Sequence, residues 1–278
     1  MLLPLKGRSW GSGPSAIMYY DLTGPEDGPV VCITHSLLSD SGMWSEQMPA
    51  LLQEGYRVLR LDMRGHGGSG PCTDKYTMQE LADDWAAALE ALGFSRVHYI
   101  GLSIGGQSGL PFVIYHGDKV ITAMLIGCAP SSGTVGSDVK SDSNTVDIVR
   151  KANSLEPIAD QIMEQFCNDA TKKSRPARYK QLRETVAETT LPGALGGMDA
   201  ILHYDFTAQL PSVKVPVLAV RGAQDPDGAE PGMRHLAELV PGGRLEQIPK
   251  AHHFCNVDQP DAFNRIMMSW LDEHRKLT

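Results

Sequence analysis

The sequence lacks the cysteine arrangement of a disulfide-rich protein or of a structural zinc site. Its five cysteines are an odd number, and they form no close C-x-x-C pair and no Cys/His ligand spacing. They are Cys32, Cys72, Cys128, Cys167 and Cys255. We therefore expect reduced thiols in a cytoplasmic protein that holds no structural metal.

Long apolar runs and an excess of positive charge are also missing. The apolar stretch in residues 1–8 is short and broken by Pro4, and no later run approaches the roughly 18 residues that a membrane span needs. The 25 Lys and Arg against 33 Asp and Glu give a net charge of -8. Such a surface is repelled by nucleic acid and by anionic lipid, so we expect neither as a partner.

What is present is a globular composition, with 42% apolar and 21% charged residues. Short β-branched runs that are apolar on both faces alternate with longer helical patterns. Strands of this kind are buried in parallel sheets that helices cover on both faces. They span residues 30–34, 57–62, 97–102, 120–126 and 215–220. The alternation predicts an α/β fold with a doubly wound, mostly parallel sheet.

Two helices are marked by apolar spacing and by their ends. The first spans residues 77–92, where Thr77 stands three residues before Glu80 as in a capping box and Gly93 follows the last turn. The second, from about residue 260 to 274, repeats the apolar spacing.

The regular alternation breaks between about residues 130 and 210. A Ser- and Gly-rich stretch opens this region, and several helical patterns follow without a strand. We therefore expect a core of residues 1–130 and 211–278 and an inserted helical cap of residues 131–210. Within the cap, residues 172–183 carry a run of Lys and Arg, for which a solvated helix face is the plain alternative to a binding role.

The most informative motif is G-x-S-x-G at residues 101–105, directly after a predicted strand and before a helix. In a nucleophile elbow the serine occupies a strained turn, and the flanking glycines avoid collisions with the neighbouring strand and helix. Ser103 is therefore the predicted nucleophile. The alternative is a glycine-rich turn with an uninvolved serine.

A serine hydroxyl needs a base and a group that orients the base. Asp225 follows the strand at 215–220, at the edge where such sheets place their sites, and is the predicted acid, with Asp227 as competitor. His252 and His253 precede the last helix, and either could be the base. The order Ser, Asp, His is the order of the α/β-hydrolases.

Two backbone N–H groups are expected to stabilise the oxyanion. One belongs to Ile104, directly after the nucleophile, and the other to Leu37 in the loop after strand 30–34. His66 and His203 can line the cleft, although nothing in their spacing assigns them a proton transfer.

With these residues the chain resembles the α/β-hydrolases over nearly its whole length, and among them the 3-oxoadipate enol-lactonases. Bacterial lactonases share Ser-Leu, Met-Trp, Arg-Val-Leu-Arg, Asp and Arg-Gly-His-Gly. Here these stand at residues 36–37, 43–44, 57–60, 62 and 64–67, and the elbow Gly-Leu-Ser-x-Gly-Gly stands at 101–106. The lactonase pattern around the base fits when the second histidine is taken, so the resemblance implies His253 as the base.

The resemblance also implies substrate-binding residues. Ser36 follows His35 where the common oxyanion dipeptide is His-Gly, and Leu38 stands where a glycine is usual and would narrow the pocket. A 3-oxoadipate enol-lactone carries a carboxylate, which Arg64 or a cap arginine could bind with two hydrogen bonds. The cap arginines in question are Arg175, Arg178 and Arg183.

The implied reaction is acyl transfer to Ser103 followed by hydrolysis, without metal or cofactor. The implied partner is a small lactone or ester, foremost a 3-oxoadipate enol-lactone or a related enol-lactone. A different cap on the same triad would serve another lactone or ester, or the C–C bond of a β-diketone. A receptor that binds a ligand in the cleft is the alternative outside enzymes, and the oligomeric state stays open.

Overall fold

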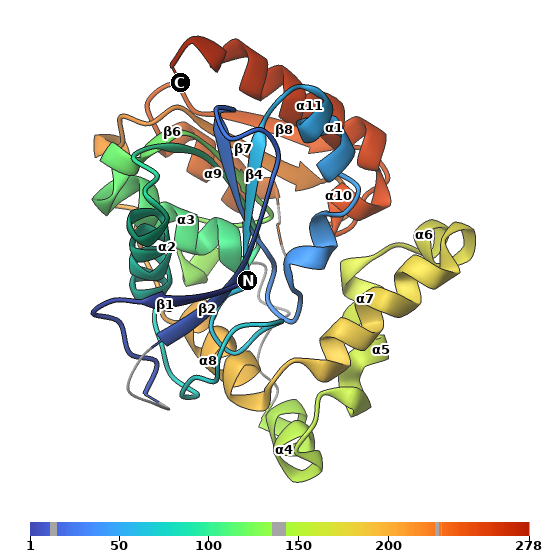
Figure 1. The fold of residues 1–278 in the computed structure, drawn as a ribbon. Helices are drawn as coiled ribbons and strands as arrows, with labels where there is room; N and C mark the ends of the chain where they lie inside the picture. Colours follow the sequence, from blue (N-terminus) through green and yellow to red (C-terminus); the bar gives the residue numbers. More distant parts are fainter. Residues whose placement is uncertain (12–15, 135–142, 226–227, 229, 278) are drawn as a thin grey trace.

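Eight strands form one sheet in the structure, a computed structural model that describes residues 1–11, 16–134, 143–225, 228 and 230–277. The strand order is β1-β2-β4-β3-β5-β6-β7-β8. Strands β3 to β8 pair in parallel, and β2 pairs antiparallel with β1 and β4 (Figure 1). The strands are β1 (Leu2–Leu5), β2 (Ala16–Thr23), β3 (Val30–Thr34), β4 (Arg57–Leu61), β5 (Val97–Leu102), β6 (Val120–Ile126), β7 (Val217–Gly222) and β8 (Arg244–Ile248).

The predicted doubly wound, mostly parallel α/β sheet is confirmed. The five predicted strands are β3 to β7, and β7 begins two residues later than the apolar pattern indicates. The apolar pattern does not predict β1, β2 and β8, which have exposed or half-exposed residues along their length. Strands β1 and β8 are the edges of the sheet and lack the continuous apolar run of buried strands, and β2 pairs antiparallel between β1 and β4, where a strand needs cover on one face only.

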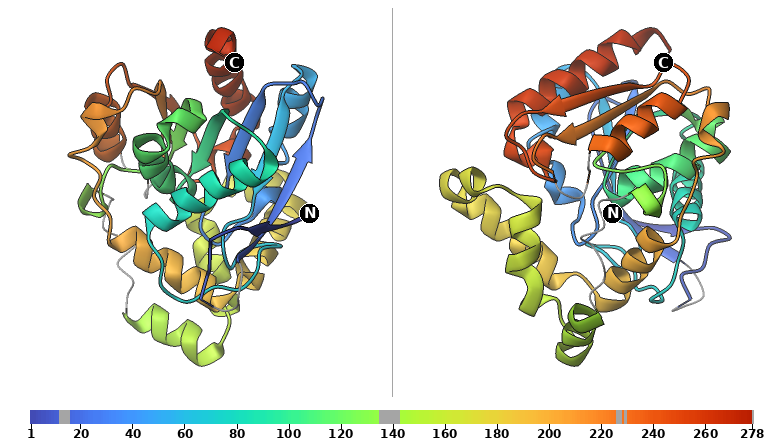
Figure 2. Two further views of the ribbon diagram at one scale, coloured as in Figure 1. Left: turned by 60° about the vertical axis from the view of Figure 1, so that its left-hand side comes forward. Right: turned by 180° about the vertical axis from the view of Figure 1, so that it is seen from behind.

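Helices cover both faces of this sheet (Figure 2). Helices α2 and α3 contact each other on one face, and α1 and α11 contact each other on the other. The capping box of Thr77 and Glu80 is present in α2, and Gly93 ends that helix with a φ of +76°. The helices outside the β6–β7 connection are α1 (Met48–Gln53), α2 (Met78–Leu92), α3 (Ile104–Tyr115), α9 (Glu230–Leu239), α10 (Cys255–Asp258) and α11 (Pro260–Glu273).

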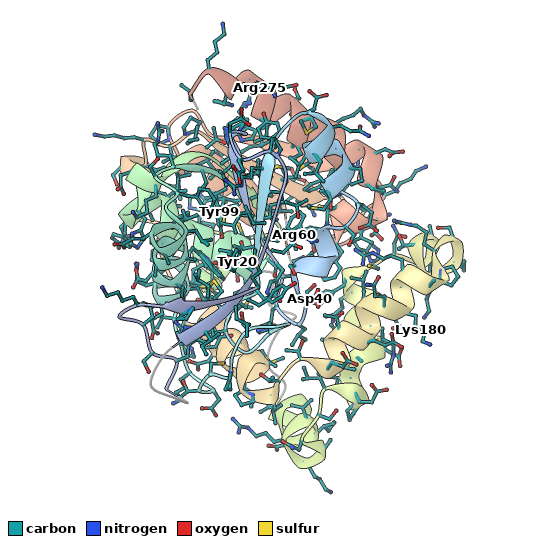
Figure 3. The ribbon with its side chains drawn as sticks, in the orientation of Figure 1. Tyr20, Asp40, Arg60, Tyr99, Lys180 and Arg275 are labelled. Atoms are coloured by element: carbon teal, nitrogen blue, oxygen red, sulfur yellow. The ribbon has the colours of Figure 1, made fainter. Side chains whose placement is uncertain are left out.

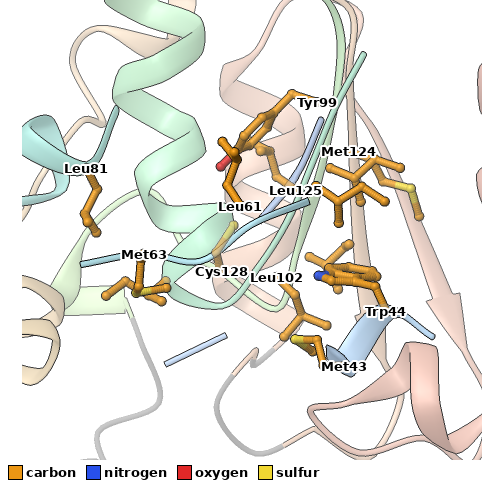
Figure 4. Packing of buried hydrophobic residues seen from close by; sticks show 14 of the residues in the cluster. Met43, Trp44, Leu61, Met63, Leu81, Tyr99, Leu102, Met124, Leu125 and Cys128 are labelled. Atoms are coloured by element: carbon orange, nitrogen blue, oxygen red, sulfur yellow. The ribbon is translucent and has the colours of Figure 1, made fainter. Parts of the chain in front are cut away.

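The central strands β5 and β6 are buried at every residue. Figure 4 shows Tyr99 and Leu102 of β5 in one cluster with Met124 and Leu125 of β6 and with Trp44. Burial of each such side chain stabilises the fold by about 1.5–3 kcal/mol. This packing fixes the strand that leads into the G-x-S-x-G motif.

The described residues between β6 and β7 form five α-helices, α4 to α8, which we call the helical insertion. They are α4 (Ser143–Ala152), α5 (Ala159–Phe166), α6 (Asp169–Ser174), α7 (Pro176–Glu188) and α8 (Leu191–Leu202). Figure 1 shows α5, α6 and α7 together beside the sheet, and α8 reaches back to contact α3. The short 3₁₀ helices are η1 (Ser41–Trp44), η2 (Gly117–Lys119), η3 (Ser132–Thr134), η4 (Glu156–Ile158), η5 (Leu210–Ser212) and η6 (Arg275–Leu277).

A polar cavity of about 410 Å³ lies between α7 and the rest of the molecule. Asp40, Arg60 and Asp62 line it on the sheet side, and Arg178 lines it from α7. In Figure 3, Asp40 and Arg60 are labelled next to the sheet, and Lys180 is labelled on α7. On this side, helix α7 therefore faces the sheet part of the molecule through polar side chains. In the described part of the chain, no helix combines the length and apolar character that crossing a membrane requires.

Candidate active site

Ser103 lies at the turn between β5 and α3. Its backbone has a φ of +56° and a ψ of -118°. Holding a residue with a side chain in this conformation costs about 1–3 kcal/mol. A Cβ atom on Gly101 would lie 2.3 Å from the carbonyl oxygen of Gly105, and one on Gly105 would lie 2.8 Å from the carbonyl oxygen of Thr34. The flanking glycines are therefore required by close backbone approach, as in a nucleophile elbow.

Hydrogen bonds hold this turn in place. The Tyr99 hydroxyl donates to the carbonyl oxygen of Gly105 at 2.6 Å and accepts from the Thr34 hydroxyl at 2.7 Å. The N–H of Ser103 donates to the carbonyl oxygen of Ile126, at the end of β6, at 2.7 Å. The serine is thus fixed to the neighbouring strand as well as to its own helix.

His253 and Asp225 form a buried pair. His253 Nδ1 lies 2.9 Å from Asp225 Oδ2 and 3.1 Å from Oδ1, and neither side chain is more than 2% exposed. Donation of the Nδ1 proton to the carboxylate leaves Nε2 as the acceptor nitrogen. A Cβ atom on Gly127 would lie 3.1 Å from His253 Cε1, so the residue after β6 must be small.

The three predicted triad residues share one edge of the sheet. Ser103 follows β5, Asp225 follows β7 and His253 follows β8, and these parallel strands end on the same side. Ile126 accepts the serine N–H, while Gly127, the next residue, lies against the histidine and the carboxylate. The end of β6 therefore links the serine to the His–Asp pair.

The two adjacent histidines have different surroundings. His253 meets Asp225, whereas the N–H of His252 donates to Asp258 at 2.8 Å. The carboxylate of Asp225 thus meets the ring of the second histidine. Asp227, the competing acid, lies outside the described residues.

Leu37 and Ile104 lie together beneath α8. A Cβ atom on Gly197 of α8 would lie 2.2 Å from Leu37 Cδ1 and 3.3 Å from Ile104 Cδ1. Ile104 is the first residue of α3, and N–H groups of a first turn have no acceptor within their helix. Leu38 is buried with a φ of +60°, a region that favours glycine, which accounts for the glycine usual at this position.

Buried histidines fix the loop after β3. His35 Nε2 accepts the N–H of Met63 at 2.9 Å, so Nδ1 carries the proton and donates to the carbonyl oxygen of Ser36 at 2.8 Å. Ser36 Oγ is buried and has no hydrogen-bond partner among the described residues. The ring of His66 lies 5.5 Å from that of His35, and burial together with this neighbour lowers the pKa of His66 to about 3.

Two predicted substrate contacts, Arg64 and His203, have other surroundings. Arg64 is 2% exposed; it donates to Asp84 at 2.6 and 2.9 Å and lies over the rings of Trp10 and Tyr76. His203, at the end of α8, has a side chain that is 68% exposed. A buried ion pair occupies the first residue and solvent surrounds the second, so neither position supports the predicted contact with substrate.

The predicted arginines of the insertion are also paired. Arg178 and Arg175 both approach Glu46, at 2.8 and 3.5 Å. Arg183 pairs with two carboxylates of the insertion, at 2.7 and 2.9 Å. All four arginines considered for substrate binding therefore have a carboxylate partner within the protein.

Sequence reasoning does not identify Phe166 or Arg221. The ring of Phe166, the last residue of α5, stacks on His253 with a centroid distance of 5.6 Å. Arg221, in β7, donates to the carbonyl oxygens of Gly228 at 2.8 Å and of Asp225 at 3.2 Å, which holds these two residues close to that strand. A charged residue inside an otherwise apolar strand is the signal for Arg221, whereas a lone aromatic in an amphipathic helix predicts only packing.

All five cysteines are free and buried. Burial raises the pKa of Cys72 to about 11 and also raises the pKa values of the other four thiols. They are therefore protonated near neutral pH and unreactive. Within the ranges that the structure describes, no group of three His, Cys, Asp or Glu residues is placed to hold a metal ion.

A parallel sheet with a serine elbow after β5 and a His–Asp pair after its last two strands is the architecture of an α/β-hydrolase. Residues 29–260 match the family model described as alpha/beta hydrolase fold. The chain belongs to this family, and the predicted resemblance is confirmed.

Known relatives extend over most of the chain. It is 28% identical over 248 residues to 3-oxoadipate enol-lactonase 2 of Acinetobacter baylyi, covering 89% of this chain and 90% of the relative. It is 30% identical over 273 residues to a bifunctional esterase/perhydrolase of Acinetobacter calcoaceticus, covering 91% and 95%. The crystal structure of the enol-lactonase from Burkholderia xenovorans matches with a TM-score of 0.86 at 26% identity, covering 92% and 97%. The family and these relatives support a hydrolase.

Proposed function

We propose that the protein is a serine hydrolase that opens an ester or a lactone, with Ser103 as nucleophile, His253 as base and Asp225 as the group that orients the base. The observation that carries the proposal is the buried 2.9 Å hydrogen bond between His253 Nδ1 and Asp225 Oδ2, on the sheet edge that holds the elbow serine. A carboxylate on Nδ1 fixes the tautomer whose Nε2 can take the serine proton.

In the proposed reaction, Ser103 Oγ forms a bond to the acyl carbon while its proton passes to His253 Nε2. The carbonyl electron pair moves onto the oxygen, and the N–H groups of Leu37 and Ile104 donate to that oxyanion. One such donor is worth about 3 kcal/mol. Collapse breaks the bond to the leaving oxygen, which takes the proton from His253, and in a lactone this oxygen stays on the acyl chain. Water then attacks the acyl-enzyme by the same proton path and releases the acid.

We propose further that residues 131–210 act as a cap, and that a neutral ester or lactone is the preferred substrate. The support is the pairing of Arg64, Arg175, Arg178 and Arg183 with carboxylates. When the N–H donors of a guanidinium already bind a carboxylate of the protein, the pair has little net positive charge left to attract an anionic substrate.

A 3-oxoadipate enol-lactone, or a related enol-lactone, is the second candidate substrate. Its support is the similarity to curated and solved enol-lactonases over about nine tenths of the chain. An enolate is also a better leaving group than an alkoxide, so the triad would need to supply less stabilisation. The charge of the substrate separates the two candidates.

The test is a panel of a neutral aryl ester, a neutral lactone, a 3-oxoadipate enol-lactone and a β-diketone, assayed at neutral pH. We expect the neutral ester and lactone to have the higher kcat/KM, and Ser103→Ala to lose at least about 10³-fold in kcat. Preference for the anionic lactone would select the second candidate. Retention of a tenth of wild-type kcat by Ser103→Ala would overturn the serine mechanism, and absence of both turnover and labelling by a fluorophosphonate would indicate a ligand receptor.

A further inference from the structure

Asp258 is a buried carboxylate that no step of the proposed reaction uses. It ends α10, five residues after His253, and is 7% exposed. It accepts hydrogen bonds from the N–H of His252 at 2.8 Å, from the hydroxyl of Thr171 at 2.5 Å and from the N–H of Asn168 at 3.2 Å. The first donor is the backbone beside His253, and the other two belong to the helical insertion.

We call residues 166–171 the α5–α6 junction and residues 250–254 the histidine loop. The junction makes two more hydrogen bonds to this loop. The side-chain amide of Asn168 donates to the carbonyl oxygen of Lys250 at 2.7 Å, and the N–H of Phe254 donates to the carbonyl oxygen of Phe166 at 2.7 Å. The loop is therefore bound to the junction on both sides of His253.

The histidine loop also depends on its surroundings for its shape. Lys250 has a φ of +59°, which a residue with a side chain keeps only when neighbouring contacts hold it. The ring of Phe166 covers one face of His253 at an interplanar angle of 29°. The contacts of the junction therefore determine both the path of the loop and the face of the imidazole that stays covered.

The three donors on Asp258 require an acceptor at each oxygen. Burial raises the pKa of Asp258, and the hydrogen bonds from Thr171, His252 and Asn168 oppose that rise. An asparagine has nearly the same shape but replaces one acceptor oxygen with an N–H₂ group, which would face a donor. That group can face only the Thr171 hydroxyl, which is able to turn and accept, while the one remaining oxygen serves the N–H groups of His252 and Asn168. The 2.5 Å hydrogen bond from Thr171 to a charged oxygen would become a longer bond between neutral groups, so the loop or the junction would have to move.

We propose that Asp258 is a positioning residue, which binds the His252 N–H and the α5–α6 junction on one carboxylate and so aligns His253 with Ser103 while the insertion is docked. The inference rests on the proposed serine mechanism. It makes the cap a part of the apparatus that orients the base, in addition to its role in selecting the substrate.

The test compares Asp258→Asn with Asp261→Asn, which makes the same change of charge at an exposed position in the first turn of α11. The rate of Ser103 labelling by a fluorophosphonate reports how well His253 activates the serine, and the final stoichiometry counts folded sites. We expect Asp258→Asn to label fully but about thirtyfold more slowly, with kcat reduced as much and KM changed by less than about threefold. Asp261→Asn should match the wild type.

The link to the insertion is tested with Thr171→Val, which removes one donor to Asp258 without a change of shape. We expect a labelling rate about fivefold below that of Thr185→Val, its control on α7, and a double variant with Asp258→Asn that is no slower than Asp258→Asn alone. Multiplication of the two effects would overturn the link between cap and base.

The remaining outcomes separate this inference from the function on which it rests. Equal labelling rates for Asp258→Asn and Asp261→Asn, in a protein whose activity requires Ser103, would overturn the inference and leave the serine mechanism intact. If labelling of Asp258→Asn does not reach full stoichiometry, part of that variant is not folded, and the labelling rates of Thr171→Val and Thr185→Val become the test. Equal rates for these two variants would overturn the inference. Activity that survives Ser103→Ala would remove the proposed function first.

Discussion

The sheet and the helical insertion are held by different kinds of contact. Strands β5 and β6 are buried at every residue, and apolar burial needs no defined partner. Helix α7 instead meets the rest of the molecule across a polar cavity and through the pair of Arg178 with Glu46. Polar contacts require particular partners at particular distances. The sheet can therefore keep its own packing while α7 changes, which fits a fold whose architecture is shared and whose substrates differ.

One helix of the insertion departs from this contrast. Helix α8 packs through glycines against the loops after β3 and β4. A Cβ atom on Gly197 would meet Leu37 Cδ1, and one on Gly193 would lie 2.5 Å from the carbonyl oxygen of Gly65. The Tyr76 hydroxyl donates to the carbonyl oxygen of Gly193 at 2.7 Å. The insertion thus has a close-packed attachment at α8 and a polar attachment at α7.

The largest effect is expected on the sheet side of the comparison. His253→Ala should lower kcat by at least about 10³-fold, because the ring that meets Asp225 is removed, and His252→Ala should lose less than about tenfold. Both values come from steady-state kinetics on the neutral ester, with the melting temperature as the check on folding. The reverse ranking would show that the loop presents His252 to the serine.

A smaller effect is expected at the attachment of α8. Gly193→Ala places a methyl group against backbone, which cannot rotate away, so α8 must move off Leu37 and Ile104. Overpacking of this kind destabilises by about 1–3 kcal/mol. We expect kcat/KM to fall about tenfold, because Leu37 and Ile104, whose N–H groups we propose as the oxyanion donors, lose their contact with α8.

The control for that variant is Gly117→Ala, whose added Cβ atom would lie 3.4 Å from Val215 and fits. Its melting temperature and kcat/KM should stay near those of the wild type. If Gly193→Ala behaves like its control, α8 is free to shift without loss, and the distinction between a close-packed and a polar attachment fails.

Local signals account for what the sequence predicts well. The elbow, the capping box of α2 and the buried strands each depend on residues within one element, and their patterns are read directly. The partners of Arg178 and Asp258 are different, since Arg178 meets a residue 132 positions away and Asp258 meets one 90 positions away. No local spacing encodes such pairs, so the positive run in the insertion predicts charge but not the carboxylate that it meets.

Leu38 shows the same limit from the other direction. In the sequence its departure from glycine suggests a narrower pocket. In the structure, Leu38 is buried and has a φ of +60°, so the exchange of glycine for leucine also has a consequence for the backbone, which must hold a side chain in a left-handed conformation. Conformation at a single residue follows from the packed loop, which composition and periodicity do not describe.

The smallest expected effect is a difference in the pH at which the two regions lose stability. On β5, burial, with smaller effects of His274 and Arg96, lowers the pKa of His98 from 6.5 to about 4. Between these two pH values, His98 binds a proton in the unfolded chain but not in the folded chain. Its contribution to the free energy of unfolding is therefore complete above pH 6.5 and falls as the pH drops toward 4. In the insertion, hydrogen bonds from Arg183 lower the pKa values of Glu156 and Asp160, whose contribution is lost only below their ordinary values of 4.5 and 3.8.

The measurement is the melting temperature between pH 7 and pH 3.5 for the wild type, His98→Gln and Arg183→Gln. A difference of one bound proton between the unfolded and folded chains changes the free energy of unfolding by at most about 1.4 kcal/mol per pH unit. In His98→Gln, the melting temperature should therefore depend less on pH between pH 6.5 and 5, by up to about 3 °C per pH unit. Arg183→Gln should leave that interval unchanged and flatten the curve only below about pH 4.5. A change of slope above pH 5 in Arg183→Gln would mean that the insertion titrates together with the sheet, because an exposed ion pair has no other way to act in that interval.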